Sequence, residues 1–98
     1  MAIQSFSDKD AEAFFVHQII NKRVGWAQMR GIVRRKLDMM HYAAELRDLR
    51  SPPGNRLEPL KRDLQGYHSI RINDQWRIVF HWTEAGPEDV MMVDYHKG

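Results

Sequence analysis

Three consecutive side chains near the end of the chain can handle protons: the carboxylate of Asp94, the phenol of Tyr95 and the imidazole of His96. An imidazole has an ordinary pKa near 6.5, so it can give or take a proton at the pH of a cell. An exposed tyrosine can stack on a nucleic-acid base, which is worth roughly 1–3 kcal/mol. The triplet indicates one wall of a site for a phosphodiester with its base attached. The alternative is a solvated C-terminal end.

Two arginines fit the same chemistry. Alternation along two neighbouring stretches predicts that Arg71 and Arg77 lie on one face of adjacent antiparallel strands. Two guanidinium groups side by side repel each other and call for an anion, and the planar fork of arginine matches the oxygens of phosphate. The alternative is that one of them pairs with a carboxylate on the surface of the sheet. The candidate carboxylates are Asp74, Glu84 and Asp89.

A period of two predicts the strands that position these arginines. Residues 67–72 and 75–82 alternate, and Asn73-Asp74 between them suits a tight hairpin turn. A last strand is expected over residues 89–95. The side chains with core-facing parity are Ile70, Ile72, Trp76, Ile78, Phe80 and Trp82, whereas Arg71, Arg77 and His81 share the other face.

Helical signals dominate the first half of the chain. A short alternating stretch at residues 3–6 suggests a first strand, and Ser7-Asp8-Lys9-Asp10 after it resembles a capping box with Asp in the position of Glu. The helix that begins there is expected to be broken at Gly25. Its expected inward side chains are Phe14, Phe15 and Ile19.

A second, longer helix is predicted from an apolar stripe in steps of three and four. The stripe consists of Trp26, Met29, Val33, Leu37, Met40 and Ala44. The stretch 51–55 then forms a connector, because its two prolines and one glycine interrupt regular structure. Two N-terminal helices packed on a small antiparallel sheet give an α+β class, in a single domain over residues 1–98.

The net charge of +2 conceals a strong asymmetry. Residues 21–62 carry eleven lysines and arginines against four acids, whereas the rest of the chain carries four against nine. A positive sector suits a polyanion or an acidic partner. The alternative is a helix whose solvated face is rich in arginine, with Arg34 and Asp38 paired across one turn.

Several classes of function are excluded or disfavoured. The chain has no cysteine, hence no disulfide and no thiolate zinc site. Its apolar runs are too short to span a bilayer, and no secretory leader is visible. The five histidines lack metal-ligand spacing, and no HExxH, glycine-rich phosphate loop or G-x-S-x-G occurs. We therefore expect a cytoplasmic protein without metal, cofactor or membrane contact.

The run LRDLRSPPGNRLEPLKRDLQGYHSIRINDQWRIVFHW, together with VDYH near the end, resembles the HigB-like branch of the RelE toxin superfamily. The resemblance covers essentially the whole chain. It implies a small antiparallel sheet on two N-terminal helices, and a toxin of a type II toxin–antitoxin pair. Such toxins are endoribonucleases that cut messenger RNA in the ribosomal A site. Their usual partner is a HigA-like antitoxin with a helix-turn-helix domain, through which alone the complex contacts operator DNA.

Site residues are also implied by the resemblance. The active-site positions of the family fall on Lys61, Arg77, Asp94, Tyr95 and His96, and Glu58 stands where some relatives have a histidine. Further phosphate contacts are expected from Arg56, Arg62 and Arg71, and weak ribosome contacts from Arg30, Arg34, Arg35 and Lys36. Arg62 departs from the family pattern, which has a glycine there; it either restricts the loop or adds a phosphate contact.

These assignments imply acid–base cleavage of RNA without metal. His96 is expected to protonate the leaving oxygen, while the base that accepts the 2′-hydroxyl proton is left open between Glu58 and Lys61. Arg77 and Lys61 are expected to stabilise the charge on the phosphate. The rival hypothesis is a catalytically inactive RelE-like module that only binds its antitoxin or RNA. Retention of residues 94–96 together with Arg77 favours the nuclease, whereas Glu58 and the altered loop 61–66 favour the rival.

Overall fold

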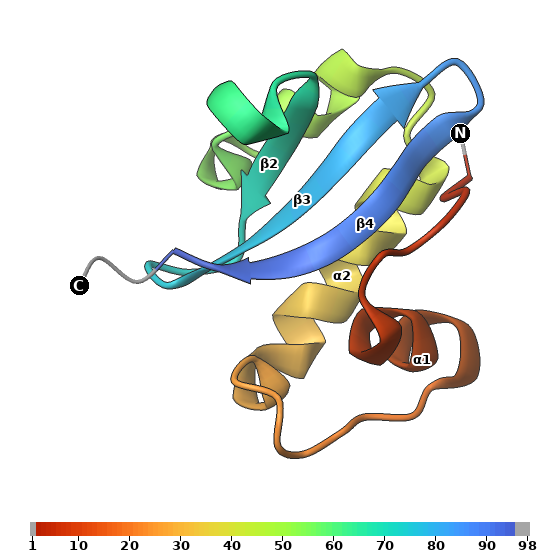
Figure 1. Ribbon diagram of the computed structural model, residues 1–98, viewed down its shortest axis with the longest axis vertical. Helices are drawn as coiled ribbons and strands as arrows, with labels where there is room; N and C mark the ends of the chain where they lie inside the picture. The colour runs from red at the N-terminus through yellow and green to blue at the C-terminus, as the bar shows by residue number, and fades with distance from the viewer. Residues whose placement is uncertain (1, 96–98) are drawn as a thin grey trace.

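The computed structural model of this chain describes residues 2–95. One face of a four-stranded sheet packs on two helices, and short 3-10 turns precede α2, join α2 to β1 and join β1 to β2 (Figure 1). The helices are α1 (Lys9–His17) and α2 (Arg30–Tyr42), and the strands are β1 (Glu58–Pro59), β2 (Tyr67–Arg71), β3 (Trp76–Thr83) and β4 (Gly86–Asp94). The 3-10 turns are η1 (Ala27–Met29), η2 (Leu46–Arg50), η3 (Pro53–Asn55) and η4 (Arg62–Leu64).

The sheet is an antiparallel meander in the order β1-β2-β3-β4. The strand boundaries agree with the alternating pattern, except that β4 begins at Gly86, earlier than expected. A register shift between Val79 and His81 bends the β3–β4 pair, and Asp89 on β4 has a left-handed φ of 53°. The predicted α+β class is thereby confirmed.

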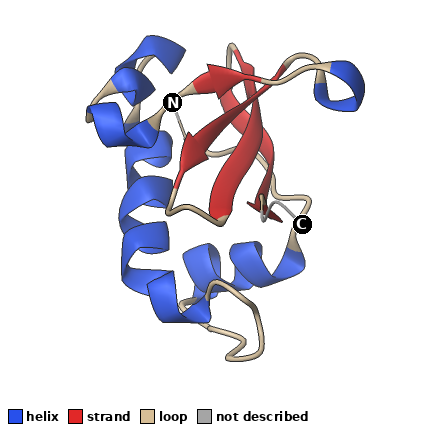
Figure 2. Cartoon of the chain, turned by 90° about the vertical axis from the view of Figure 1, so that its left-hand side faces the viewer, coloured by secondary structure: helices blue, strands red, loops and turns tan. Residues whose placement is uncertain are grey.

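The core lies between α2 and the face of the sheet that it covers (Figure 2). Alternation decides which strand residues reach it, since successive side chains point to opposite faces. The fully buried side chains include Val33, Leu37 and Met40 from α2 and Ile70, Ile78 and Phe80 from the sheet. Burying a side chain of this size stabilises the fold by roughly 1.5–3 kcal/mol. No helix among residues 2–95 is long and apolar enough to cross a membrane.

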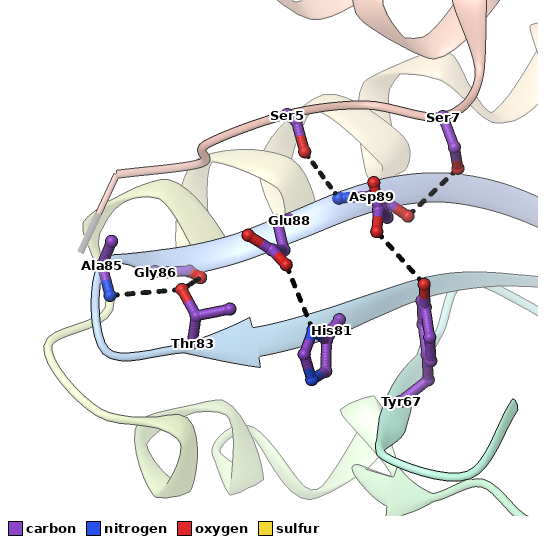
Figure 3. A network of polar contacts seen from close by, with 9 residues as sticks. All are labelled: Ser5, Ser7, Tyr67, His81, Thr83, Ala85, Gly86, Glu88 and Asp89. Carbon is purple, nitrogen blue, oxygen red and sulfur yellow. Dashed lines mark hydrogen bonds and ion pairs between the residues drawn. The ribbon is translucent and has the colours of Figure 1, made fainter.

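The expected first strand at residues 3–6 is wrong. This segment runs beside β4 but forms only one isolated parallel bridge, from Phe6 to Val90. Serine hydroxyls replace part of the ladder: Ser5 Oγ accepts from the Asp89 N–H at 2.9 Å, and Ser7 Oγ donates to the Asp89 carbonyl at 3.2 Å (Figure 3). The left-handed backbone of Asp89 explains the interruption, because it turns the peptide groups away from extended pairing.

The first helix differs from prediction at both ends. Its N-cap is Asp8 rather than Ser7, because Asp8 Oδ1 accepts from the N–H groups of Asp10 and Ala11 at 3.1 Å. The helix ends at His17, long before Gly25, because the next residue, Gln18, adopts a left-handed φ of 57°. Ile19 was expected inside but is 61% exposed, since it lies beyond this stop.

The second helix is shorter than its apolar stripe. Trp26 and Met29 precede it in and around the turn η1, although Trp26 is still only 2% exposed. At the other end Ala43 leaves the helix with a ψ of 134°. This change of direction buries Ala43 and exposes Ala44, which reverses the expectation for Ala44.

Replacing Asp8 by alanine should destabilise the fold by about 1–2 kcal/mol, because a helix cap is worth about 1 kcal/mol and Asp8 does more than cap. Its Oδ2 also accepts from the Met92 N–H at 3.0 Å and thus ties α1 to β4. Urea unfolding measures the loss. Glu12→Ala, an exposed acid in the same turn, is the matched control and should cost under about 0.5 kcal/mol. Equal losses would show that neither the cap nor the link to β4 contributes measurable stability.

Candidate active site

The two arginines lie directly opposite each other across the β2–β3 hairpin. Arg71 is paired in register with Arg77, so both side chains leave the same face of the sheet, as alternation predicts. Each meets a carboxylate: Arg71 Nη2 lies 2.5 Å from Asp74 Oδ1, and Arg77 Nη2 lies 2.6 Å from Glu58 Oε1. The first pair is the alternative that the sequence left open. The second was not foreseen.

Arg77 is held by three oxygen atoms from three segments. Besides binding Glu58, its Nη1 donates to Ser69 Oγ at 2.6 Å and to the carbonyl oxygen of Arg56 at 3.4 Å. The side chain is only 10% exposed, and its Cζ lies 5.4 Å from the centre of the Tyr95 ring. A guanidinium fixed in this way loses little further freedom when an anion binds, which favours binding.

These side chains surround a pocket of about 290 Å³ on the face of the sheet that carries Arg77. The lining residues are Arg56, Glu58, Arg71, Asn73, Asp74, Arg77 and Tyr95. The volume is close to the lower end for ligand sites, about 300–1,000 Å³. Three guanidinium groups against two carboxylates leave one excess positive charge. The pocket therefore suits a single phosphodiester group beside an aromatic ring.

Two residues of this site were missed at the level of sequence. Ser69 is fully buried and anchors Arg77; its parity with Arg71 was the available signal. Asn73 was read only as a turn residue. Its Oδ1 accepts from the N–H groups of Gln75 and Trp76 at 2.9 and 2.7 Å, which leaves its amide nitrogen to donate to a ligand.

The end of β4 closes the pocket beside the hairpin. Gln75 Nε2 donates to Asp94 Oδ2 at 3.2 Å, and the Gln75 carbonyl accepts from the Tyr95 N–H. These contacts bring Tyr95 into the lining, where it is 36% exposed. His96, the expected proton donor, lies outside the described residues. It follows Tyr95 directly in the sequence, so the described chain stops at the edge of the pocket.

Lys61 and Arg62 do not join the pocket lining. They follow β1 at the opposite end of the hairpin, where the Leu60 N–H donates to the Tyr67 carbonyl. Both side chains are exposed. Arg62 has a φ of 59°, the left-handed region that a glycine occupies without strain. Arginine thus keeps the backbone form expected of the family glycine, at a cost of about 1–2 kcal/mol.

Lys36 was expected on a solvated, ribosome-facing surface, and this expectation is wrong. It is 8% exposed, and its Nζ donates to Asn55 Oδ1. Burial, followed by the charges of Arg35 and Arg71, lowers the pKa of Lys36. The stripe of basic residues on α2 therefore divides, because one of its members turns inward to hold the connector.

Asn55 links α2 to the pocket. It is fully buried, and its Nδ2 donates to the carbonyls of Leu49 and Ser51 at 3.1 and 3.2 Å. The next residue, Arg56, has a left-handed φ of 46° and presents its carbonyl to Arg77. A buried amide thus fixes the backbone turn from which one of the three Arg77 contacts is made.

The remaining basic residues of α2 are available to different degrees. Arg30 and Arg35 are exposed, although Arg30 Nη1 also donates to the Ala27 carbonyl at 3.1 Å. Arg34 is half-buried: it pairs with Asp38 at 3.4 Å, as predicted, and lies 5.0 Å from the centre of the Phe15 ring. Arg30 and Arg35 are therefore the better candidates for contact with a polyanion.

A second polar cluster occupies the far end of β3 and β4 (Figure 3). Tyr67 Oη donates to Asp89 Oδ2 at 3.2 Å, and His81 Nδ1 lies 3.3 Å from Glu88 Oε1. Burial and the bond to Asp89 raise the pKa of Tyr67. Among residues 2–95, no group of three or more His, Asp or Glu side chains is arranged to hold a metal ion.

The amino-acid sequence of this chain is similar to those of known toxins. The family described as the RelE-like toxin of the type II toxin–antitoxin system HigB matches residues 4–96. Toxin HigB-1 from Vibrio cholerae is 37% identical over 85 residues, which cover 87% of either chain. An uncharacterized protein from Haemophilus influenzae is 41% identical over 65 residues, covering 66% of this chain and 63% of the relative.

Solved structures share the fold. The YoeB dimer from Staphylococcus aureus has a TM-score of 0.56 and 22% identity over 99% of this chain and 98% of its own. The YoeB/ParE toxin from Agrobacterium tumefaciens has a TM-score of 0.54 and 24% identity over 99% of this chain and 100% of its own. At these identities the likeness concerns the arrangement of helices and strands alone.

Asn55→Ala should destabilise the protein by about 2–4 kcal/mol, because it leaves the buried ammonium of Lys36 without its acceptor. Urea unfolding measures the change, with the exposed Asn21→Ala as the matched control, expected to cost under about 1 kcal/mol. Lys36→Met combined with Asn55→Leu should recover part of the loss, since both polar partners are then gone. A single Asn55→Ala variant as stable as Asn21→Ala would contradict the link.

Proposed function

Because this chain belongs to the HigB-like toxins, the RelE-like toxins of type II toxin–antitoxin systems, we propose that it is a ribosome-dependent endoribonuclease. Its substrate is messenger RNA in the ribosomal A site, and its effect is to stop translation. The observation that carries the proposal is the register pair of Arg71 and Arg77 in a pocket with Tyr95. Paired guanidinium groups bind phosphate, and the ring offers a face to a base.

Cleavage proceeds through attack of the 2′-hydroxyl oxygen on the adjacent phosphorus. The new O2′–P bond forms as the P–O5′ bond breaks, which leaves a 2′,3′-cyclic phosphate and a 5′-hydroxyl. His96 gives its proton to the departing O5′, and Asp94 positions the imidazole. Arg77, already fixed by Glu58 and Ser69, stabilises the negative charge that builds on the non-bridging oxygens.

Glu58 is the proposed acceptor of the 2′-hydroxyl proton. It lines the pocket beside Arg77 and its side chain is 53% exposed, so a hydroxyl can reach it. Lys61 and Arg62, outside the lining, contact phosphates of neighbouring nucleotides instead. The mechanism uses no metal and no cofactor. Arg56 and Arg71 assist in holding the scissile phosphate.

The proposed partners are a HigA-like helix-turn-helix antitoxin, the ribosome and its messenger, with operator DNA reached only through the antitoxin. The site of action is the cytoplasm, and residues 1–98 act as one toxin domain. A second candidate function is an inactive binding module. It is favoured by the pairing of Arg71 with Asp74 and of Arg77 with Glu58, since phosphate must compete with both carboxylates.

His96→Ala should lower the cleavage rate by about 10²–10⁴-fold, the usual contribution of a general acid. The purified protein is added to a message, alone and in a translating extract, and 5′ ends are mapped by primer extension. The exposed His17→Ala is the matched control and should cut like the wild type. Undiminished cutting by His96→Ala would remove the assignment. If the folded wild type neither cuts RNA nor arrests growth, the binding module is the better account.

Reversing the charge of Arg30 and Arg35 should weaken ribosome binding without moving the cut sites. Each lost phosphate contact reduces the slope of log K against log[salt] by about 0.7–0.9, so the double variant should lose up to about two units. Sedimentation with ribosomes at several salt concentrations measures the slope. Lys9→Glu on α1 controls for charge alone. An unchanged slope would mean that this face is merely solvated.

A further inference from the structure

A second cavity lies between η2 and the edge strand β1, and it shares no lining residue with the arginine pocket. Its volume is about 500 Å³, well within the range of ligand sites. We call it the η2–β1 groove; it is bounded by Leu46, Leu57, Pro59 and His68, with Arg47 and Arg50 as its basic residues. None of these six residues has a role in the proposed cleavage of RNA.

The groove has an apolar character. Leu46 and Leu57 are only partly buried, which leaves part of each exposed, and Pro59 is exposed. His68 stacks on Phe80 with ring centroids 6.3 Å apart, and burial lowers its pKa, which favours the neutral ring. Among the described residues no group hydrogen-bonds its buried Nδ1. A bulky apolar side chain therefore fits this cavity better than a charged one.

The charged residues of the groove determine which charge a bound ligand should carry. Arg47 is 75% exposed and pairs at 2.8 Å with Glu45, another lining residue. Arg50 is exposed and has no ion pair within residues 2–95. One positive charge thus remains unmatched beside the apolar cavity, and a guanidinium binds carboxylates well. The complementary ligand is a peptide that joins a bulky apolar side chain to acidic residues.

Strand β1 makes the groove suitable for a peptide in particular. It is one of the two outer strands of the sheet, a position at which partner chains commonly add to proteins. Side chains alternate between two sites along β1 and the residue before it: Leu57 and Pro59 line the groove, while Glu58 between them holds Arg77 on the other side. A partner in the groove would therefore pack on the same short strand that supplies a carboxylate to the arginine pocket.

We propose that the η2–β1 groove is the docking site of the antitoxin, through an acidic segment with a bulky apolar side chain. The identity of this partner rests on the proposed function; the chemistry of the segment rests on the groove. Its apolar side chain packs between Leu46, Leu57 and Pro59, and its carboxylates bind Arg47 and Arg50. A polynucleotide is disfavoured, because the lining offers one unmatched charge and no exposed aromatic residue.

The test uses the full chain and the purified, fluorescently labelled antitoxin encoded in the same operon. Arg47→Glu combined with Arg50→Glu should raise the Kd by at least about tenfold, since truncation or reversal of such pairs costs that much or more. Lys22→Glu with Arg23→Glu, the same charge change on an exposed stretch outside both sites, is the matched control and should stay within about twofold. The substituted side chains are exposed, and thermal unfolding checks that both variants are folded.

Three results would overturn the docking site. The first is that the groove variant binds the antitoxin with wild-type affinity, and the second is that both variants lose affinity equally. The third is that the wild type is a dimer and only the groove variant is a monomer, which would assign the groove to a second copy. Ribosome-dependent cleavage by the same samples tests the proposed function separately. If antitoxin binding depends on the groove but the wild type does not cleave RNA, the proposed nuclease function is wrong and the docking site is supported. If the wild type cleaves RNA but antitoxin binding does not depend on the groove, the nuclease function is supported and the docking site is wrong.

Discussion

The burial of Arg77 is the constraint on which the rest of this face of the molecule depends. A permanently charged guanidinium with a side chain only 10% exposed is tolerated only if oxygens surround it, since removing one partner of a buried pair costs about 3–5 kcal/mol. The oxygens come from three places: Glu58 on β1, Ser69 on β2 and the backbone of Arg56. One side chain thus draws three segments together, and the pocket forms around it.

The contacts that hold Arg77 also depend on helix α2. Arg56 can turn its carbonyl to Arg77 because Asn55 before it is anchored to Lys36 on α2. The backbone at Arg56 is left-handed, a conformation that costs a non-glycine residue about 1–2 kcal/mol and persists only where neighbours impose it. The connector is therefore a structural element in its own right. It connects Lys36 on α2 to Arg77 on the open face of the sheet, through Asn55 and the carbonyl of Arg56.

The two sides of β1 give that short strand two tasks. Glu58 faces the arginine pocket, while Leu57 and Pro59 face the η2–β1 groove. The short segment 57–59 thus separates a polar pocket from an apolar groove.

Periodicity in the sequence was sufficient for the α+β class, the hairpin and the placement of Arg71 and Arg77 on one face, because side-chain direction in a strand is a local property. It also paired Arg34 with Asp38 one helical turn apart. It could not show that Lys36 turns inward, that Glu58 neutralises Arg77 or that Lys61 stays outside the pocket. Those outcomes join residues that are distant in the chain, and only tertiary packing decides which buried charge meets which oxygen.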